Sequence, residues 1–296
     1  MPNQFCNQAL PGGNFLTVHN TAASVRQKLK NLARSSQENF NLVLTRFGLE
    51  RLLYRISVSS HAELFTLKGG TLFYCWTQQL HRPTRDLDFL GAGDADAEKF
   101  LQVFQEILQQ EVPDDGMLFD PQEITADSIR DNQEYHGIRV TVPASLGSAR
   151  LRLQVDIGFG DTVTPYASSV KYPALLDFPQ AEIQAYSMET VIAEKFQAMV
   201  ELGISNSRMK DFYDIWKFAT EFEIEPAMLK TAVHATFERR LTPLPQALPV
   251  ALSDEFAAEP DKQTQWGAFC QRVGCSVTLP EVIQVIRPFL LQSLSL

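Results

Sequence analysis

Asp86 and Asp88 stand two residues apart in the segment 86–90 (Asp-Leu-Asp-Phe-Leu), where acidic and apolar residues alternate. Alternation with period two predicts a strand and places both carboxylates on the same face of it. Burying two like charges side by side is costly unless a cation or basic groups compensate them. The pair therefore predicts a metal site at the edge of a sheet, with hard oxygen ligands that suit Mg²⁺.

The segment before this strand predicts a phosphate site. Residues 64–68 are expected to form a short strand, and Lys68-Gly-Gly-Thr71 joins it to a helix expected over 71–80. Backbone N–H groups at a helix N-terminus favour phosphate, and glycine lets a phosphate approach the main chain closely. A Gly-Gly turn of this kind is more often only a turn, and this one lacks the spacing of a P-loop.

A third carboxylate is expected from a hairpin further along the chain. Segments 135–143 and 149–158 are typical of two strands joined by a turn, with apolar residues on one face of the second strand, namely Leu151, Leu153, Val155 and Ile157. Asp156 lies on the opposite face of that strand. The order of strand, Gly-Gly turn, helix and acidic strand is therefore followed by one more acid.

Helical periodicity is expected on both sides of this core. The N-terminal helices are expected over 21–34 and 37–57, and later helices over 95–110, 187–199, 210–220, 226–236 and 280–294. The proline-containing stretch 243–260 is expected to be a linker or loop. We predict an N-terminal helical segment (1–60), a core (61–180) and a C-terminal helical domain (181–296).

The distribution of charge matters more than its sum. The net charge is −9, yet residues 1–60 hold seven Lys or Arg against two acids, because the basic surplus lies in the two N-terminal helices. Arg46, Arg51 and Arg55 are expected on the surface of the second helix. Basic helices of this kind are suited to the RNA backbone.

Composition bounds the remaining possibilities. The first thirty residues lack the apolar region of a signal peptide, and no window approaches about 18 uninterrupted apolar residues, so we expect a cytoplasmic protein without a membrane partner. The cysteines form no Cys-x-x-Cys pair and are expected to be free thiols: Cys6, Cys75, Cys270 and Cys275.

The order of these motifs resembles the nucleotidyltransferase superfamily with the polymerase-β-like fold. More narrowly, it is similar to the AbiEii toxin family, the nucleotidyltransferase toxins of bacterial abortive-infection and MenAT-type toxin–antitoxin systems. The motifs that carry the resemblance are Lys68-Gly-Gly-Thr71, Arg82-Pro-Thr-Arg-Asp-Leu-Asp88, Asp156, Glu194-Lys-Phe-Gln-Ala198 and Arg208-Met-Lys-Asp-Phe-Tyr-Asp214. The resemblance covers about residues 60–220 and implies an α+β fold, with a mixed sheet flanked by N-terminal and C-terminal helices.

The resemblance also implies roles for individual residues. Asp86 and Asp88 would bridge a pair of Mg²⁺ ions, Asp156 would hold the ion on the acceptor side, and Asp211 would lie close to the active site. The groups expected to bind the NTP are Lys68, Gly69, Gly70, Thr71, Arg85 and Lys195. Many family members carry Gly-Ser at the turn, so a hydroxyl contact to phosphate would come here from Thr71. Another possibility for Asp211 and Asp214 is a structural ion-pair network with Lys195 or Arg208.

The implied activity is transfer of a nucleotide from an NTP to an RNA acceptor. For this family the acceptor would be the tRNA 3′ end, and translation would stop until a cognate antitoxin relieves the block; the protein is expected to be a monomer. Two alternatives stay open: the same site could modify a protein or a small molecule, or the fold could be a non-catalytic binding scaffold. Label from NTP on tRNA, protein or small-molecule fractions would distinguish the acceptors, and loss of NTP·Mg²⁺ binding would favour the scaffold.

Overall fold

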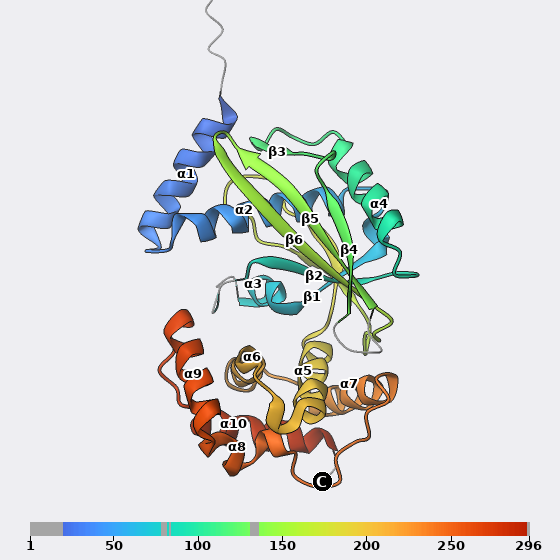
Figure 1. Cartoon of the computed structure of the whole chain (residues 1–296), viewed down its shortest axis with the longest axis vertical. Coiled ribbons are helices and arrows are strands. Elements are labelled where there is room, and N and C mark those ends of the chain that lie inside the picture. The colour runs from blue at the N-terminus through green and yellow to red at the C-terminus, as the bar shows by residue number, and fades with distance from the viewer. Residues whose placement is uncertain (1–19, 78–81, 83, 131–135, 295–296) are drawn as a thin grey trace, which may run out of the picture.

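The computed structural model describes residues 20–77, 82, 84–130 and 136–294, and a mixed sheet lies at its centre (Figure 1). The strands are β1 (Phe65–Lys68), β2 (Asp86–Gly91), β3 (Met117–Phe119), β4 (Thr125–Arg130), β5 (His136–Leu146), β6 (Ala149–Phe159), β7 (Ser168–Lys171) and β8 (Glu182–Ala185). Their order is β3-β5-β6-β2-β1-β8-β7, and β4 also pairs with β5. Strands β2 and β6 run parallel, as do β1 and β8, whereas the other neighbours are antiparallel.

Helices flank the sheet, as the sequence predicts. They are α1 (Thr21–Ser35), α2 (Phe40–Ser57), α3 (Leu72–Thr77), α4 (Ala97–Gln109), α5 (Met188–Leu202), α6 (Met209–Glu221), α7 (Pro226–Arg239), α8 (Asp254–Ala258), α9 (Pro260–Val273) and α10 (Leu279–Leu291). Figure 1 shows α1, α2 and α4 beside the sheet, while α5 to α10 gather in the other half of the picture. The helix α5 begins after Ser187, whose hydroxyl accepts a hydrogen bond from the Thr190 N–H. The mixed sheet with helices around it confirms the predicted fold class.

The apolar face of the sheet is covered by α2 and α4. Period two in β2 and β6 places Leu87, Phe89, Val155 and Ile157 on this face, and all four are buried. The ring of Phe65 packs edge-on against Phe89, Phe100 and Phe104, which joins β1 to β2 and α4. Because the apolar residues occupy this face, the polar residues of the same strands project from the other.

Several elements differ from those expected from the sequence. The short strands β3, β4, β7 and β8 were not expected, and the predicted extension of the third helix from 78 to 80 lies outside the described residues. The stretch 243–260 is not a plain linker, because it contains α8 and the start of α9. Among the described helices, none is both long and apolar enough to cross a membrane.

Two N-terminal arginines that were expected on the surface are buried. Arg51 pairs with Glu50 at 2.8 Å and also donates to the carbonyl oxygen of Pro179. Arg55 pairs with Asp115 at 2.6 Å. The surface expectation is wrong for these two residues because buried acids compensate their charges: Glu50 is adjacent on the same helix, whereas Asp115 lies on a distant segment of the chain. Two of the three arginines of α2 therefore form ion pairs inside the protein and are not available to a partner at its surface.

Two cysteines expected to be free are joined. Cys270 and Cys275 form a disulfide with a Cα–Cα distance of 4.7 Å. The helix α9 ends at Val273, and Gly274 follows in the left-handed conformation with φ +76°, so the chain reverses and brings Cys275 back to Cys270. Cys75 is a free thiol, and Cys6 lies outside the described residues.

Candidate active site

A glycine turn packs directly against the first acidic strand. After β1 the chain makes a single 3₁₀ turn, Gly69–Thr71, and enters α3. Gly69 has φ +76°, and a Cβ atom at this position would lie 2.1 Å from the Oδ2 atom of Asp88. A Cβ atom on Gly70 would lie 2.3 Å from an η nitrogen of Arg82. Only glycine at both positions lets the turn approach the carboxylate and the guanidinium this closely.

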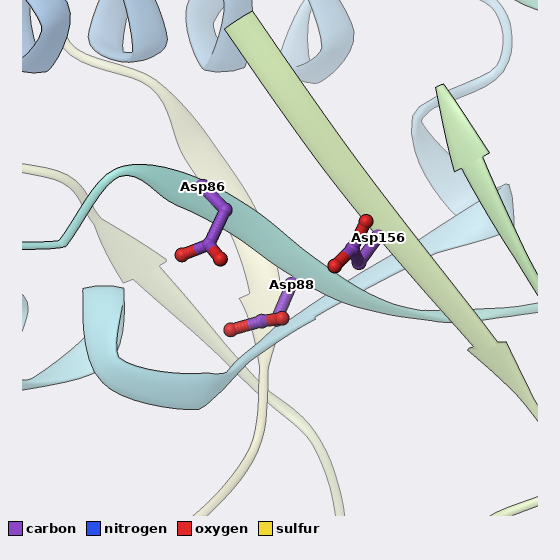
Figure 2. Close-up of side chains that lie close together, drawn as sticks. All are labelled: Asp86, Asp88 and Asp156. Atoms are coloured by element: carbon purple, nitrogen blue, oxygen red, sulfur yellow. The ribbon is translucent and has the colours of Figure 1, made fainter. Parts of the chain in front are cut away.

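The three acids that the sequence singled out converge in space. The parallel register of β2 and β6 places Asp88 opposite Asp156, and Asp86 lies two residues earlier on the same face of β2. Figure 2 shows the three side chains projecting into one region beside the glycine turn. One oxygen from each carboxylate lies within 4.8 Å of the others. We call Asp86, Asp88 and Asp156 the acidic triad.

The acidic triad carries more negative charge than its surroundings compensate. Burial, together with the neighbouring carboxylates of Asp86 and Asp156, raises the pKa of Asp88 to about 6, while Lys210 and Lys68 oppose the shift. Within the described residues, the carboxylates of Asp86 and Asp88 accept no hydrogen bond and form no ion pair. A cation bound between them would remove this mutual repulsion.

Asp156 differs from the other two acids because it already has a partner. Arg139 lies directly across from it on β5 and donates two hydrogen bonds, one to each carboxylate oxygen, both 2.8 Å long. The side-chain amide of Gln154 donates a third, at 3.1 Å. The turn at Gly147 and Ser148 fixes the register that brings Arg139 to Asp156.

The donor set of the triad fits a divalent metal ion. Carboxylate oxygens are hard ligands, and Mg²⁺ is usually held by one or two carboxylates together with water and substrate phosphates. The triad supplies oxygens close enough to share an ion, and burial together with the neighbouring carboxylates raises the pKa of Asp88, which a bound cation would oppose. The residues present therefore fit the metal that the sequence predicts.

A second group of charges on α5 and α6 is compensated from within. The Nζ atom of Lys195 lies 2.6 Å from Asp211 and 2.9 Å from Asp214. Arg82 forms two hydrogen bonds of 2.9 Å with Asp214, and the Nε atom of Arg208 lies 2.8 Å from Asp211. These five residues form what we call the ion-pair cluster. The network considered for Asp211 and Asp214 is present, and Lys195 is buried in it rather than solvated.

Lys68 belongs to another compensated group. Its Nζ atom lies 3.0 Å from Asp161 and 3.6 Å from Glu194, and Arg240 pairs with both of these acids. Despite burial, Lys68 and Arg240 hold the pKa of Asp161 at about 2. Arg240 is thus part of an ion-pair network with these two acids. Lys68 is opposite Asp88 in the pairing of β1 with β2, so it lies between this network and the triad.

The remaining predicted residues lie around the glycine turn. Thr71 is buried, and its hydroxyl donates to the backbone carbonyl of Asp86 at 3.2 Å, which fastens the turn to β2. Arg85 is exposed immediately before β2. The acidic triad therefore lies beside the turn. Lys195 and Asp211 lie in the ion-pair cluster instead. Arg82 belongs to that cluster and also lies against Gly70.

Two charged residues near the triad were missed by sequence reasoning. Arg139 holds Asp156, and Lys210 is exposed on α6 yet close enough to Asp88 to lower its pKa. A two-residue turn at Gly147 and Ser148 would have placed Arg139 across from Asp156, since the paired residue numbers of a hairpin have a constant sum. We find no local signal in the sequence for the proximity of Lys210 to Asp88, because it depends on how α6 packs.

Comparisons with known proteins give one family match and two partial structural similarities. Two solved structures from Helicobacter pylori are similar in part. JHP933 has a TM-score of 0.44 and 14% identity, and the match covers 82% of this chain and 90% of that one. A proposed nucleotidyltransferase has a TM-score of 0.42 and 13% identity, and the match covers 82% of this chain and 93% of that one. No curated protein matches. The family model described as "Nucleotidyl transferase AbiEii toxin, Type IV TA system" matches residues 51–285. The chain therefore belongs to the AbiEii family of nucleotidyltransferase toxins.

Proposed function

We propose that this toxin transfers a nucleotide from an NTP to the 3′ end of tRNA in an Mg²⁺-dependent reaction and so blocks translation. The observation that carries the proposal is the convergence of Asp86, Asp88 and Asp156 beside the glycine turn. Nucleotidyl transfer needs charge stabilisation at both the attacking and the leaving oxygen of the α-phosphorus. Converging carboxylates next to a phosphate-binding turn are suited to that chemistry.

The acids have distinct tasks in this proposal. Asp86 and Asp88 would hold Mg²⁺, and Asp156 would contribute a ligand on the acceptor side, near the attacking 3′ hydroxyl. When bound, the metal supplies a Lewis acid that stabilises negative charge on the reacting phosphate oxygens. Arg139, on β5, fixes the position of the Asp156 carboxylate through its two hydrogen bonds.

The glycine turn and nearby cations bind the triphosphate. The backbone at Gly69 and Gly70 can approach phosphate closely, since neither residue has a side chain in the way. Thr71 holds the turn in place through its bond to Asp86, which supports a positioning role. Lys68 and the exposed Arg85 provide positive charge for the β- and γ-phosphates.

Lys195 and Asp211 contribute as a pair. Lys195 stays protonated because Asp211 and Asp214, despite the burial of its side chain, raise its pKa. Arg82 extends from this cluster to Gly70 at the turn. The cluster therefore holds a positively charged guanidinium beside the proposed triphosphate site. We propose that Asp211 orients Lys195 toward the nucleotide, and that its loss reduces transfer through this orientation.

The proposed function has consequences for organisation and partners. We propose that residues 61–180 form the catalytic core, with helical units at 1–60 and 181–296. The protein acts in the cytoplasm as a monomer, where NTP, Mg²⁺ and tRNA are present, and a cognate antitoxin protein relieves its effect.

Incubation of the full-length protein with bulk tRNA and each radioactive NTP in turn tests this function. We expect label on tRNA that requires a divalent cation and is removed by chelation with EDTA. Protein and small-molecule fractions are counted in the same reaction. Label found only in those fractions would contradict the RNA acceptor, and absence of both label and NTP·Mg²⁺ binding by calorimetry would favour a non-catalytic scaffold.

A further inference from the structure

The β5–β6 hairpin carries positive charge near its tip, at a distance from the acidic triad. Arg150 and Arg152 are exposed on β6, and the described residues contain no acidic partner for either. Between residues 136 and 159 there are three arginines and a single acid, Asp156. This local surplus contrasts with a whole chain whose net charge is −9.

The pleat of β6 connects these arginines to the candidate active site. Residues 150, 152, 154 and 156 alternate with the buried residues of the strand, so their side chains project from the same face as Asp156. Across the hairpin on that face lie Ser145, Pro143 and Thr141, which are uncharged. Arg150 lies six positions before Asp156 on the strand, a distance of about 20 Å.

Helix α1 continues the positive charge beyond the tip of the hairpin. Arg26 donates from a guanidinium nitrogen to the hydroxyl of Ser148 at 3.3 Å. Lys30 and Arg34 follow at intervals of four residues, so they lie along the same side of the helix for a further rise of about 12 Å. The helix contains no acidic residue. Figure 1 shows the hairpin running from the centre of the molecule to α1.

We infer that Arg26, Lys30, Arg34, Arg150 and Arg152, here called the basic strip, bind the phosphate backbone of the RNA acceptor at a distance from its reacting 3′ end. This inference rests on the proposed function. Arg34, Arg150 and Arg152 are exposed, Arg26 and Lys30 are half-buried, and neither α1 nor residues 136–155 of the hairpin include an acid. A long row of cations of this kind matches a polyanion with regularly spaced charges. The strip leads to Asp156, on the acceptor side of the site, rather than to the glycine turn, where the NTP binds.

The basic strip predicts that the RNA is bound in two places, at the acidic triad and along the strip. The 3′ terminal nucleotides reach the triad, while the helical stem of the RNA lies along the hairpin and α1. A short single-stranded oligonucleotide can reach the triad without contacting Arg150 or Arg152, so the strip does not affect its use as an acceptor. Whole tRNA depends on both regions, and its affinity falls steeply as salt rises.

The test is tRNA binding by the full-length double variant Arg150→Gln, Arg152→Gln, measured by fluorescence anisotropy over a range of salt without NTP. We expect affinity to fall on the order of tenfold at low salt, and the slope of log K against log salt to become shallower by about 2. The matched control is Arg272→Gln, an exposed arginine on α9, which should bind as the wild type does. Arg150→Lys with Arg152→Lys should restore most of the affinity, because charge is kept.

Unchanged affinity and salt slope in the Gln double variant would overturn the inference and leave the strip available to an acidic protein partner. Equal transfer to tRNA by variant and wild type at subsaturating tRNA would overturn it as well. Wild-type protein that binds tRNA through the strip but transfers no nucleotide would instead contradict the proposed function and not the strip. Equal use of a short oligonucleotide acceptor by both proteins confirms that the double variant keeps an intact active site.

Discussion

The acidic triad and the ion-pair cluster both gather carboxylates in a partly or fully buried place, yet they are compensated differently. In the ion-pair cluster, Asp211 and Asp214 are contacted by Lys195, Arg82 and Arg208. In the triad, Arg139 contacts Asp156, and no described residue forms an ion pair with Asp86 or Asp88. Acids that the protein neutralises itself stabilise its structure, whereas acids left without a partner are available to a cation from solution.

The largest expected effect separates the two groups by activity. Asp88→Asn removes a proposed metal ligand while preserving shape, so transfer to tRNA should fall by about 10³-fold or more. Its stability at neutral pH should not fall, because the substitution relieves repulsion with Asp86. Labelling of tRNA and urea unfolding measure the two effects. The exposed Asp94→Asn serves as control, and normal labelling by Asp88→Asn would contradict the metal assignment.

The opposite result is expected in the ion-pair cluster. Asp214→Ala leaves Lys195 and Arg82 buried without this carboxylate, so the free energy of unfolding should fall by about 3–5 kcal/mol. The urea midpoint should move, with little change in slope. A variant as stable as the wild type would show that the cluster is not a structural network and would remove the contrast with the triad.

The glycine turn provides a geometric test. Gly69→Ala places a methyl group against Asp88 and also requires a left-handed backbone, so transfer should fall by about 10²-fold as the carboxylate is displaced. Gly267→Ala is the matched control, because a Cβ atom there meets nothing within 4 Å, and its helical position should tolerate or favour alanine. Similar activity in the two alanine variants would mean that the close approach at Gly69 has no functional importance.

Glu50 has a raised pKa, as Asp88 does, but it already has a cationic partner, so it shows the effect of burial alone on a carboxyl group. Burial raises the pKa of Glu50 to about 7 even though Arg51 contacts it. A folded-state pKa above the unfolded value means that ionisation destabilises the fold, so stability should fall by about 2 kcal/mol between pH 5 and pH 7. The difference should vanish in Glu50→Gln and should not respond to Mg²⁺. If the free energy of unfolding of the wild type rose from pH 5 to pH 7 relative to that of the variant, the prediction would be contradicted.

Arg139 sharpens the contrast within the triad itself. Its two hydrogen bonds occupy Asp156, so a second metal ion must compete with the guanidinium. Arg139→Gln should therefore bind the weaker of two Mn²⁺ ions on the order of tenfold more tightly, as measured by calorimetry without nucleotide. Arg139→Lys, which keeps the charge but loses the paired hydrogen bonds, should be intermediate. Weaker Mn²⁺ binding by Arg139→Gln would instead indicate that orientation of Asp156 outweighs competition.

Local patterns were sufficient to predict the frame of the site. The alternation around Asp86 and Asp88, the glycine turn after β1 and the apolar face of β6 are each set within a few residues, and the structure confirms all three. The expected convergence of Asp156 with Asp86 and Asp88 also holds, because it requires only that β2 and β6 be neighbours.

Properties set by distant segments could not be predicted in the same way. Helical periodicity placed Arg55 on the surface, because it carries no information about a contact with a residue far along the chain. Its buried partner, Asp115, lies 60 positions away in sequence. Lys195 was expected to bind the NTP, and its burial between Asp211 and Asp214 depends on how α5 packs against α6. The short strands at the edges of the sheet likewise depend on neighbours rather than on their own residues.

Anomalous diffraction from crystals of the full-length protein grown with Mn²⁺ and a non-hydrolysable NTP tests the central claim most directly. We expect a Mn²⁺ peak bound by carboxylate oxygens of both Asp86 and Asp88, at roughly 2.0–2.5 Å. A site without such a peak, or one in which lysine or arginine side chains pair with both carboxylates while Mn²⁺ binds elsewhere, would contradict it.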